Sequence, residues 1–303
     1  MAKKITKAVI LAAGLGTRML PIAKSVPKEM LPIVDRPAMQ YNVAEAAASG
    51  ITDILIITNR GKEMIENYFD YSPEYESLLE KKGDEKSLEN LRAIRKIPNL
   101  ANIHYIRQKE PKGLGHAVLC AKSFVGDDDF VAIYGDDIII GEKPATRELI
   151  EVYEKFGGGI CVAAVKEVER EKLQSYCSLD VVSSADNSEF YVYDMIEKPK
   201  TNAEIFSNYA ILGRVLLTPE IFGFLKTQKP GAGNEIQLTD SMKRLVTSVG
   251  KEKPAKMIAK VFSGERHDMG SKLGFLRANV IEGAKHPEFG EDFKKFLREF
   301  VKE

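Results

Sequence analysis

The residues with the clearest chemical potential lie near the start of the chain, in a loop that is rich in glycine. An apolar run over residues 8–12 has the length and branching of a buried strand. It ends at Gly14 and Gly16, where a backbone without Cβ atoms can fold closely around a bound group. Arg18 follows, and Lys28 comes after two prolines that stiffen the path. Backbone N–H groups and two cations in this order predict a site for a polyanion such as a triphosphate.

The spacing of these glycines excludes two better-known phosphate sites. A Rossmann dinucleotide site needs a third glycine at a fixed distance, and a P-loop closes with Gly-Lys-Ser/Thr; this segment has neither. A glycine pair after a strand is by itself a weak indication of a nucleotide site, because many α/β proteins carry one. The interpretation therefore depends on the charged residues that accompany the pair.

Asp136 is the second candidate, in the run Tyr134-Gly-Asp-Asp137. An apolar strand expected at residues 130–134 places this aspartate just beyond the strand's carboxyl end. Mg²⁺ binds through one or two carboxylates together with substrate phosphates, so Asp136 is a candidate magnesium ligand. The alternative is an ordinary aspartate in a turn, because Gly-Asp is common turn chemistry.

Two further clusters combine polar side chains with turn residues. Gln108 precedes Lys112-Gly-Leu-Gly-His116, and a side-chain amide beside a flexible backbone can pair with the edge of a uracil. The same glycines could simply form a turn from a strand into a helix. Glu197 and Lys198 follow a strand expected at residues 191–196. On an extended segment they point to opposite faces, so we expect that they do not neutralise each other; a solvated charged turn is the alternative.

The order of apolar runs and helical patterns predicts how these residues are positioned. Strands that alternate with helices in the first half of the chain predict a mainly parallel sheet covered on both faces, with ligands at the carboxyl ends of its strands. Later strands with little helix between them predict an appended antiparallel portion. The expected strands are residues 8–12, 53–58, 103–107, 130–134, 160–165, 178–182, 191–196 and 208–217. The expected helices are residues 39–48, 61–69, 114–123, 144–156, 219–225, 238–249, 271–282 and 292–301.

Composition restricts the class of protein. A chain of 303 residues has room for one large or two medium domains. Lys plus Arg and Asp plus Glu both number 44, and this balance argues against nucleic acid as a partner. Three cysteines without a C-x-x-C pair favour a reducing compartment. The apolar run after the first lysines is too short for a signal peptide, and no run is long enough for a membrane span, so we expect a cytoplasmic protein.

Taken together, the motifs resemble those of the sugar-1-phosphate nucleotidyltransferases, whose signature is Gly14-Leu-Gly-Thr-Arg18 followed by Pro27-Lys-Glu-Met-Leu-Pro32. The second motif and Gly231-Ala-Gly-Asn-Glu-Ile-Gln-Leu-Thr-Asp240 are similar to the bacterial UTP–glucose-1-phosphate uridylyltransferase branch. His267-Asp-Met-Gly270 resembles the late element that brings a second carboxylate to the metal. The resemblance extends from residue 7 to about residue 297.

This resemblance implies an α/β fold with a Rossmann-like, mainly parallel but mixed sheet flanked by helices and a small antiparallel portion on the sugar side. It implies one nucleotidyltransferase domain over residues 1–303, with a nucleotide-binding half at about 1–165, a sugar-binding portion at about 166–270 and C-terminal helices at 271–303. Residues 71–101, rich in Glu and Lys, would be a helical insertion. We interpret it as a solvated amphipathic excursion, and a lid or a subunit contact is the alternative.

The implied reaction is the Mg²⁺-dependent conversion of UTP and glucose 1-phosphate into UDP-glucose and pyrophosphate, by in-line attack on the α-phosphorus. The implied assembly is a homodimer or a homotetramer. The residues implied to act in catalysis are Arg18, Lys28, Asp136 and Lys198, and those implied to bind the metal are Asp136 and Asp268. The residues implied to contact the substrates are Ala12, Ala13, Gly14, Gly16, Glu29, Gln108, Gly113, Cys177, Glu197, Lys198 and Glu235.

Cys177 is the main departure from the branch, which has a glycine there whose backbone approaches the sugar. A Cβ and a thiol at this position keep two alternatives open. The chain could use another nucleoside triphosphate or sugar 1-phosphate, or it could be a weakly active paralogue that binds a nucleotide sugar. The simpler interpretation is that Cys177 is a small buried apolar residue in a strand.

Overall fold

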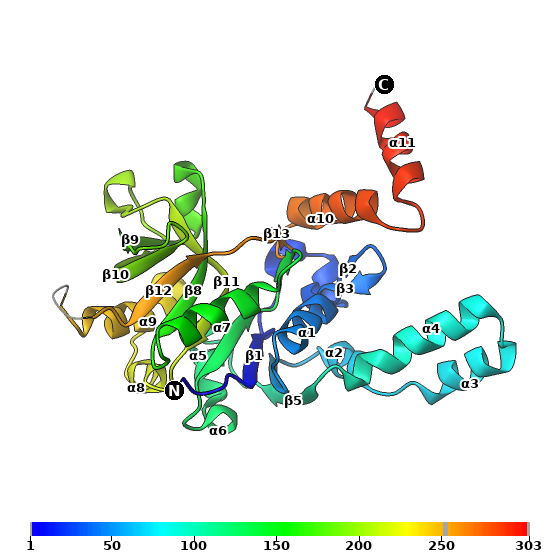
Figure 1. Cartoon of the computed structure of the whole chain (residues 1–303), viewed down its shortest axis with the longest axis horizontal. Coiled ribbons are helices and arrows are strands. Elements are labelled where there is room, and N and C mark those ends of the chain that lie inside the picture. The colour runs from blue at the N-terminus through cyan, green and yellow to red at the C-terminus, as the bar shows by residue number, and fades with distance from the viewer. Residues whose placement is uncertain (1, 251–253, 302–303) are drawn as a thin grey trace.

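A nine-stranded sheet forms the centre of the computed structural model, which describes residues 2–250 and 254–301 (Figure 1). The strand order is β5-β4-β1-β6-β11-β8-β12-β10-β9. The side chains of β1, β4 and β6 are nearly all apolar and buried, as expected of parallel strands that are covered on both faces. The parallel strands on this side of the sheet are β1 (Lys7–Leu11), β4 (Asp53–Thr58), β5 (Asn102–Arg107) and β6 (Phe130–Tyr134).

The antiparallel strands belong to the same sheet. β11 (Tyr209–Leu217) lies in its centre, antiparallel to β6 on one side and to β8 (Cys161–Glu167) on the other. β12 (Met257–Val261) runs parallel to β8, and β10 (Glu189–Glu197) and β9 (Cys177–Ser183) complete the edge as antiparallel strands. The predicted α/β fold with a mixed sheet is therefore confirmed. The antiparallel strands are not an appended unit, however, because the nearly continuous apolar run of β11 has to be covered on both faces.

Two apolar layers cover the two faces of this sheet. On one face, α1 (Ala38–Ala48), α2 (Glu63–Phe69) and α7 (Ala145–Lys155) pack against residues such as Ile10 and Ile54. On the other face, the next residues along the same strands, Val9 and Leu55, face a second layer. The helices of that layer are α5 (Leu114–Cys120), α6 (Lys122–Val125), α8 (Ile221–Lys226) and α9 (Leu238–Thr247).

The sequence predicted most of these elements, and each expected strand has a counterpart that begins and ends within two residues of it. The helix expected at residues 114–123 is divided into α5 and α6. β12 and two short ribbons were not expected from the sequence. One ribbon pairs β7 (Asp137–Ile140) with β13 (Glu265–Asp268), and the other pairs β2 (Pro32–Ile33) with β3 (Arg36–Pro37). These strands have two to five residues, too few for a clear alternation.

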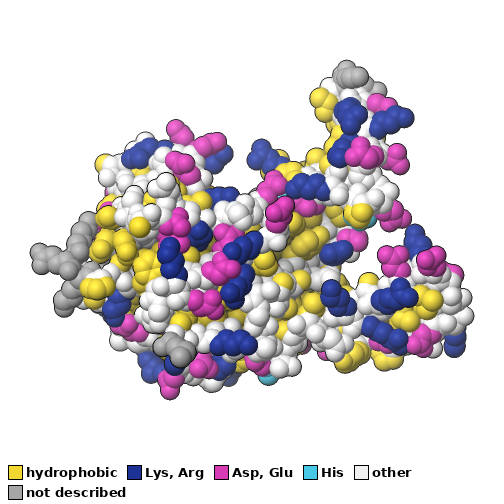
Figure 2. Space-filling view, in the orientation of Figure 1, with side chains coloured by type: hydrophobic (Ala, Val, Ile, Leu, Met, Phe, Trp, Pro, Cys, Tyr) yellow, Lys and Arg dark blue, Asp and Glu magenta, His cyan; other side chains and the backbone are white. Residues whose placement is uncertain are grey.

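Two helical arms project from the body of the molecule (Figures 1 and 2). The first consists of α3 (Pro73–Lys82) and α4 (Glu85–Lys96), joined by an ion pair of 2.7 Å between Arg95 Nε and Glu76 Oε2. Most of the stretch at residues 71–101 is thus helical, as expected. Its status as an insertion and its role as a lid or a subunit contact stay predictions. The second is α11 (Gly290–Phe300), at the end of α10 (Lys272–Lys285). α10 itself packs on the body, where Ala278 is buried and Asn279 is hydrogen-bonded to the backbone of Pro32 and Val34.

The predicted division of the chain into a nucleotide half and a sugar half stays a prediction. Residue 1, residues 251–253 and residues 302–303, which belong to the predicted domain or to its C-terminal helices, lie outside the described part of the chain. Among the described residues, none of the helices combines the length and the apolar character that crossing a membrane requires.

Arg214 connects the centre of the sheet to one end of β6. Its side chain is fully buried on β11, and its guanidinium forms an ion pair of 2.6 Å with Glu45 of α1. The same group donates to the side chain of Asn42 at 2.7 Å and to the backbone carbonyl of Asp137 at 2.7 Å. Asn42 in turn donates to the carbonyl of Gly135 at 3.1 Å. These bonds hold the turn that carries Asp136 against α1.

Candidate active site

The site begins where β1 and β6 end side by side. Leu11, the last residue of β1, is in register with Tyr134, the last residue of β6. Beyond this pair the N–H of Gly135 donates to the carbonyl of Leu11 at 3.0 Å. A Cβ atom on Gly135 would lie 2.8 Å from that carbonyl oxygen, so only glycine allows the two chains to approach this closely. The glycine loop after β1 and Asp136 after β6 therefore share one edge of the sheet.

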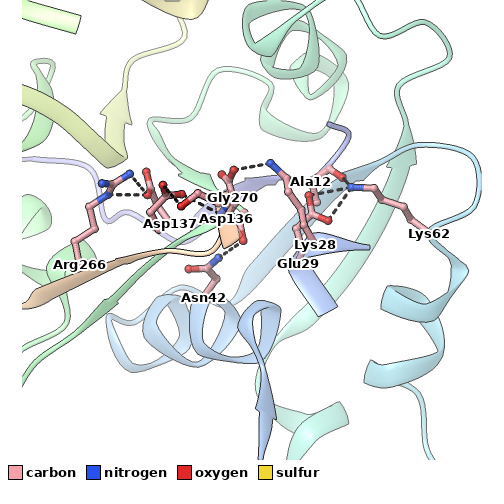
Figure 3. Close-up of polar contacts among 12 residues, drawn as sticks. Ala12, Lys28, Glu29, Asn42, Lys62, Asp136, Asp137, Arg266 and Gly270 are labelled. Carbon is pink, nitrogen blue, oxygen red and sulfur yellow. Dashed lines mark hydrogen bonds and ion pairs between the residues drawn. The ribbon is translucent and has the colours of Figure 1, made fainter. Parts of the chain in front are cut away.

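Lys28 lies across this edge and joins two of the predicted groups (Figure 3). Its Nζ is 2.5 Å from Oδ2 of Asp136. It is also 3.7 Å from the point where Gly14 would carry a Cβ atom, so the ammonium lies over the glycine loop. Burial alone would raise the pKa of Asp136, but the Lys28 ammonium outweighs it and holds that pKa below its usual value. The carboxylate is therefore ionised at neutral pH.

Asp268 reaches the same place from the other end of the chain. The ribbon of β7 and β13 sets it opposite Asp137, and the backbone N–H of Met269 donates to the carbonyl of Asp136 at 2.8 Å. The N–H of Gly270 and the hydroxyl of Ser271 hold the Asp268 carboxylate at 2.9 and 3.1 Å.

Gly270 lies where three of the predicted site groups come close together. A Cβ atom there would lie 2.6 Å from Oδ2 of Asp136, 3.1 Å from Oδ1 of Asp268 and 3.4 Å from Nη2 of Arg18. Two carboxylate oxygens around one point fit the oxygen ligands that a hard divalent cation prefers. The sequence motif contained this glycine, but nothing in its spacing showed that it faces both aspartates.

Asp137 has a partner of its own. Its carboxylate pairs with the guanidinium of Arg266, with distances of 2.7 Å to Nε and 2.5 Å to Nη2 (Figure 3). Burial raises the pKa of Asp137 to about 6, against the opposing effect of Arg266. Nη1 of Arg266 also donates to the hydroxyl of Tyr176 at 3.3 Å. The pair therefore connects the Asp136 turn to the segment that precedes Cys177.

Gln108, Gly113 and Glu235 come together at another edge of the site. Gln108 is buried, and its Nε2 donates to the carbonyl of Gly113 at 3.1 Å and lies 2.9 Å from Nδ1 of His116. Gly113 has a φ of +102°, and a Cβ atom on it would lie 2.7 Å from Cβ of Glu235. Gly113 is thus packed closely against Glu235, and a side-chain amide beside a glycine backbone is a combination that can pair with a pyrimidine edge.

Glu197 and Lys198 correct one expectation. Nζ of Lys198 lies 3.7 Å from Oε1 of Glu197, so the two charges face each other instead of pointing to opposite faces. β10 ends at Glu197, and Lys198 adopts a left-handed conformation with a φ of +47°. The alternation of a strand therefore stops before Lys198. Its N–H donates to the carbonyl of Tyr176 at 2.9 Å, which places both residues beside the start of β9.

Cys177 begins β9 opposite Glu197, and its side chain is 4% exposed. The thiol belongs to the apolar layer that contains Leu179 and Met195, and burial raises the pKa of the thiol well above its usual value. The structure thus places the thiol as a small buried apolar group, which was the simpler of the two interpretations of this residue. Contact with a substrate by its backbone stays a prediction.

Lys62 is a charged residue of this region that sequence reasoning missed. Its Nζ donates to both carboxylate oxygens of Glu29, at 2.9 and 2.8 Å, and to the carbonyl of Ala12 (Figure 3). Glu29 is fully buried. In the sequence Lys62 lies between Gly61 and Glu63, and nothing distinguishes it there from a solvated lysine.

Comparisons with known proteins give the following similarities. The model of the family described as nucleotidyl transferase matches residues 7–280. The chain is 46% identical over 295 residues to a UTP–glucose-1-phosphate uridylyltransferase of Bacillus subtilis (strain 168), with 97% of both sequences covered. It is 46% identical over 297 residues to one of Staphylococcus epidermidis (strain ATCC 12228), with 98% and 99% covered.

Solved structures are similar over the same length. The UTP-bound UGPase from Acinetobacter baumannii is 37% identical, with a TM-score of 0.86 over 98% of this chain and 99% of that one. A UDP-glucose pyrophosphorylase complexed with UDP-glucose is 36% identical, with a TM-score of 0.82 over 93% of this chain and 100% of that one.

The buried position of the Cys177 thiol leads to a prediction about stability. Cys177→Gly removes a packed side chain and adds backbone freedom to a strand, so we expect the free energy of unfolding to fall by about 1–3 kcal/mol in urea denaturation. Cys177→Ala, which keeps the Cβ atom, is the matched control and should lose less. Unchanged stability of Cys177→Gly would mean that the thiol is not packed.

Proposed function

This chain belongs to the nucleotidyl transferase family, and we propose that it transfers the uridylyl group of UTP to glucose 1-phosphate, giving UDP-glucose and pyrophosphate. The observation that carries the proposal is the similarity over almost the full length of both chains to enzymes named for this activity. The site geometry agrees with it, because cations and carboxylates meet beside a glycine loop at the carboxyl ends of parallel strands.

The reaction needs two polyanions to come together. A phosphate oxygen of glucose 1-phosphate attacks the α-phosphorus of UTP in line, a new P–O bond forms, and the bond to the β-phosphate breaks. The electron pair of that bond leaves with pyrophosphate. No covalent enzyme intermediate is required, so the protein contributes position and charge compensation. Arg18, which lies beside Gly270, and Lys28, which lies over the glycine loop, are assigned to the triphosphate and the leaving pyrophosphate.

The family is typically metal-dependent, and we assign Mg²⁺ to this chain. Asp136 and Asp268 would hold the ion, because their carboxylate oxygens lie close together beside Gly270. A bound Mg²⁺ would neutralise charge on the phosphate oxygens. Asp137 is not assigned to the metal, since Arg266 already pairs with its carboxylate.

The sugar and the base are assigned to the two flanks of this centre. The side chain of Lys198 is 48% exposed, so its ammonium is accessible to the sugar phosphate, and Glu197 beside it is assigned to the sugar hydroxyls. Gln108 and the backbone of Gly113 are assigned to the uracil. The remaining substrate contacts proposed from the sequence are Ala12, Ala13, Gly14, Gly16, Glu29, Cys177 and Glu235.

The competing hypotheses concern the choice of substrate and the level of activity. Cys177 was the reason to consider a different sugar or a weakly active paralogue. Its thiol is buried in an apolar layer, so it does not by itself obstruct a sugar. We therefore expect Cys177→Gly to leave the use of glucose 1-phosphate unchanged. A cytoplasmic location stays a prediction from the sequence.

We further propose a homodimer or a homotetramer in which the second arm contacts another copy of the chain. Phe296 and Phe300 of α11 are 56% and 64% exposed and lie one turn apart on one face of the helix. Glu291 and Asp292 begin α11, and Arg298 lies in its last turn. An antiparallel copy of α11 would therefore match acidic to basic ends and cover the phenylalanines, as a two-fold contact requires.

Asp136→Asn tests the metal ligand within a screen of pyrophosphate release. The wild type should be fastest with UTP and glucose 1-phosphate among the nucleoside triphosphates and sugar 1-phosphates offered with Mg²⁺. Loss of the ligand charge should lower kcat by more than about tenfold without a fall in Tm. Asp128→Asn, at an exposed pair with Lys7, is the control. If Asp136→Asn had a wild-type kcat at saturating Mg²⁺, Asp136 would not be a site residue. If the wild type preferred dTTP to UTP, the proposed nucleotide would be wrong.

Lys28→Ala and Lys198→Ala should weaken the binding of different substrates. Lys28→Ala should weaken UTP binding, and Lys198→Ala should weaken binding of glucose 1-phosphate or UDP-glucose, because each lysine is assigned to a different phosphate. Calorimetric titration of each ligand into each variant measures this. Lys200→Ala, another exposed lysine beside Pro199, is the control. If both changes weakened UTP binding equally, this assignment would be wrong.

The proposed contact through α11 is testable by the mass of the particle in solution. Phe296→Glu combined with Phe300→Glu places charges in the proposed apolar interface, so light scattering should give half the mass of the wild type: one chain if the wild type is a dimer, and two if it is a tetramer. Phe206→Glu, at an exposed phenylalanine elsewhere, should keep the mass of the wild type. A wild-type monomer, or a double variant with the wild-type mass, would contradict the proposal.

A further inference from the structure

Lys62 and Glu29 form a buried ion pair next to the site, and no step of the proposed reaction uses it. Their side chains are 7% and 1% exposed. Both oxygens of Glu29 and the carbonyl of Ala12 accept from the Lys62 ammonium (Figure 3). An ammonium has three N–H donors, and these three acceptors use all of them. Lys62 is thus held in one orientation and has no donor left for a substrate.

The pair joins segments that are distant in the sequence. Ala12 begins the glycine loop, whereas Glu29 stands next to Lys28 in the short 3₁₀ turn Lys28–Met30. Lys62 belongs to the loop between β4 and α2, and Asn59 of that loop donates to the carbonyl of Ala13 at 2.5 Å. The loop between β4 and α2 therefore binds the carbonyls of Ala12 and Ala13 at the start of the glycine loop. Through Glu29 it also binds the turn that carries Lys28.

The pair also sets the balance of charge around Lys28. Lys28 faces two carboxylates, Asp136 and Glu29, and both raise its pKa against the effect of burial. Burial raises the pKa of Glu29. The two cations around it, Lys62 and Lys28, act against this effect and lower that pKa. Lys62 supplies the nearer compensation, and the Lys28 ammonium pairs with Asp136 at 2.5 Å. Without Lys62, a buried carboxylate would be left with Lys28 as its remaining cation.

We propose that Lys62, acting through Glu29, is a positioning residue for the uridylyl transfer: it compensates the Glu29 carboxylate, so that the Lys28 ammonium stays over the glycine loop beside Asp136. This inference rests on the proposed function. It assigns Glu29 to the support of Lys28, although the sequence suggested a direct contact with the substrate. A displacement of Lys28 by about 1 Å is sufficient to cost on the order of a hundredfold in rate, because the reacting groups depend on orientation.

Lys62→Met tests the proposal together with the double variant Lys62→Met/Glu29→Gln. Lys62→Met should weaken UTP binding and lower kcat/KM for UTP by about 10–100-fold, because Lys28 turns toward the uncompensated Glu29. The double variant removes both charges and should recover at least about tenfold of that loss. The double variant would relieve a purely structural defect as well, so the deciding measurement is the KM for UTP. A loss of folded protein lowers the apparent kcat and leaves the KM for UTP unchanged, whereas a displaced Lys28 raises that KM.

Lys7→Met is the matched control. Lys7 also donates to two backbone carbonyls, those of Phe124 and Val125, and pairs with a carboxylate, Asp128, but it lies at the opposite end of β1. The kcat/KM of Lys7→Met for UTP should stay within about twofold of the wild-type value, because the substitution leaves the groups around Lys28 unchanged.

Several outcomes would overturn the proposal. One is a Lys62→Met variant whose kcat/KM and affinity for UTP equal those of the wild type. Another is a double variant whose kcat/KM for UTP is no higher than that of Lys62→Met. If Lys62→Met does not fold, the double variant carries the test, and a folded double variant as inactive as Lys28→Ala overturns the proposal. If the wild type and Lys7→Met release no pyrophosphate from UTP and glucose 1-phosphate, the proposed function has failed. Calorimetric UTP binding then still decides the role of Lys62.

Discussion

The parallel pairing of β1 with β6 is the constraint on which the site depends. Because Leu11 and Tyr134 are in register, the glycine loop and the Asp136 turn leave the sheet at the same level. The contact is so close that Gly135 tolerates no side chain. Every other group of the centre is placed relative to these two loops. Lys28 crosses between them, and the ribbon of β7 and β13 brings Asp268 to them from the end of the chain.

Compensation of buried charge is the second principle of the site. A carboxylate removed from water without a partner is costly, and four carboxylates around this edge of the sheet each have a cation within ion-pair distance, whereas Asp268 is held by the N–H of Gly270 and the hydroxyl of Ser271. Each pair also connects segments that are far apart in the sequence, so neutralisation and positioning are achieved by the same bonds. The pairs are Lys28 with Asp136, Lys62 with Glu29, Arg266 with Asp137 and Arg214 with Glu45.

The two flanks of the centre are less constrained than the centre itself. Lys198 is half exposed and lies in a left-handed turn, and Glu235 is exposed beside Gly113. Side chains that must receive and release substrates are expected at such positions, because loops can move without disturbing the core. The backbone bonds of Lys112 and Gly115 to Ile236 nevertheless connect the two loops of the base side.

The sequence by itself determined the class of fold, the expected strands and the glycine loop, because apolar periodicity and glycine spacing are local properties of the chain. It also indicated Lys28 and Asp136 as site residues through motifs of neighbouring positions. Only the tertiary structure decided that β11 lies inside the sheet and that Lys62 faces Glu29. The physical reason is that burial and ion pairing depend on segments that meet only after folding, and a lysine in the sequence carries no sign of the carboxylate that it will neutralise.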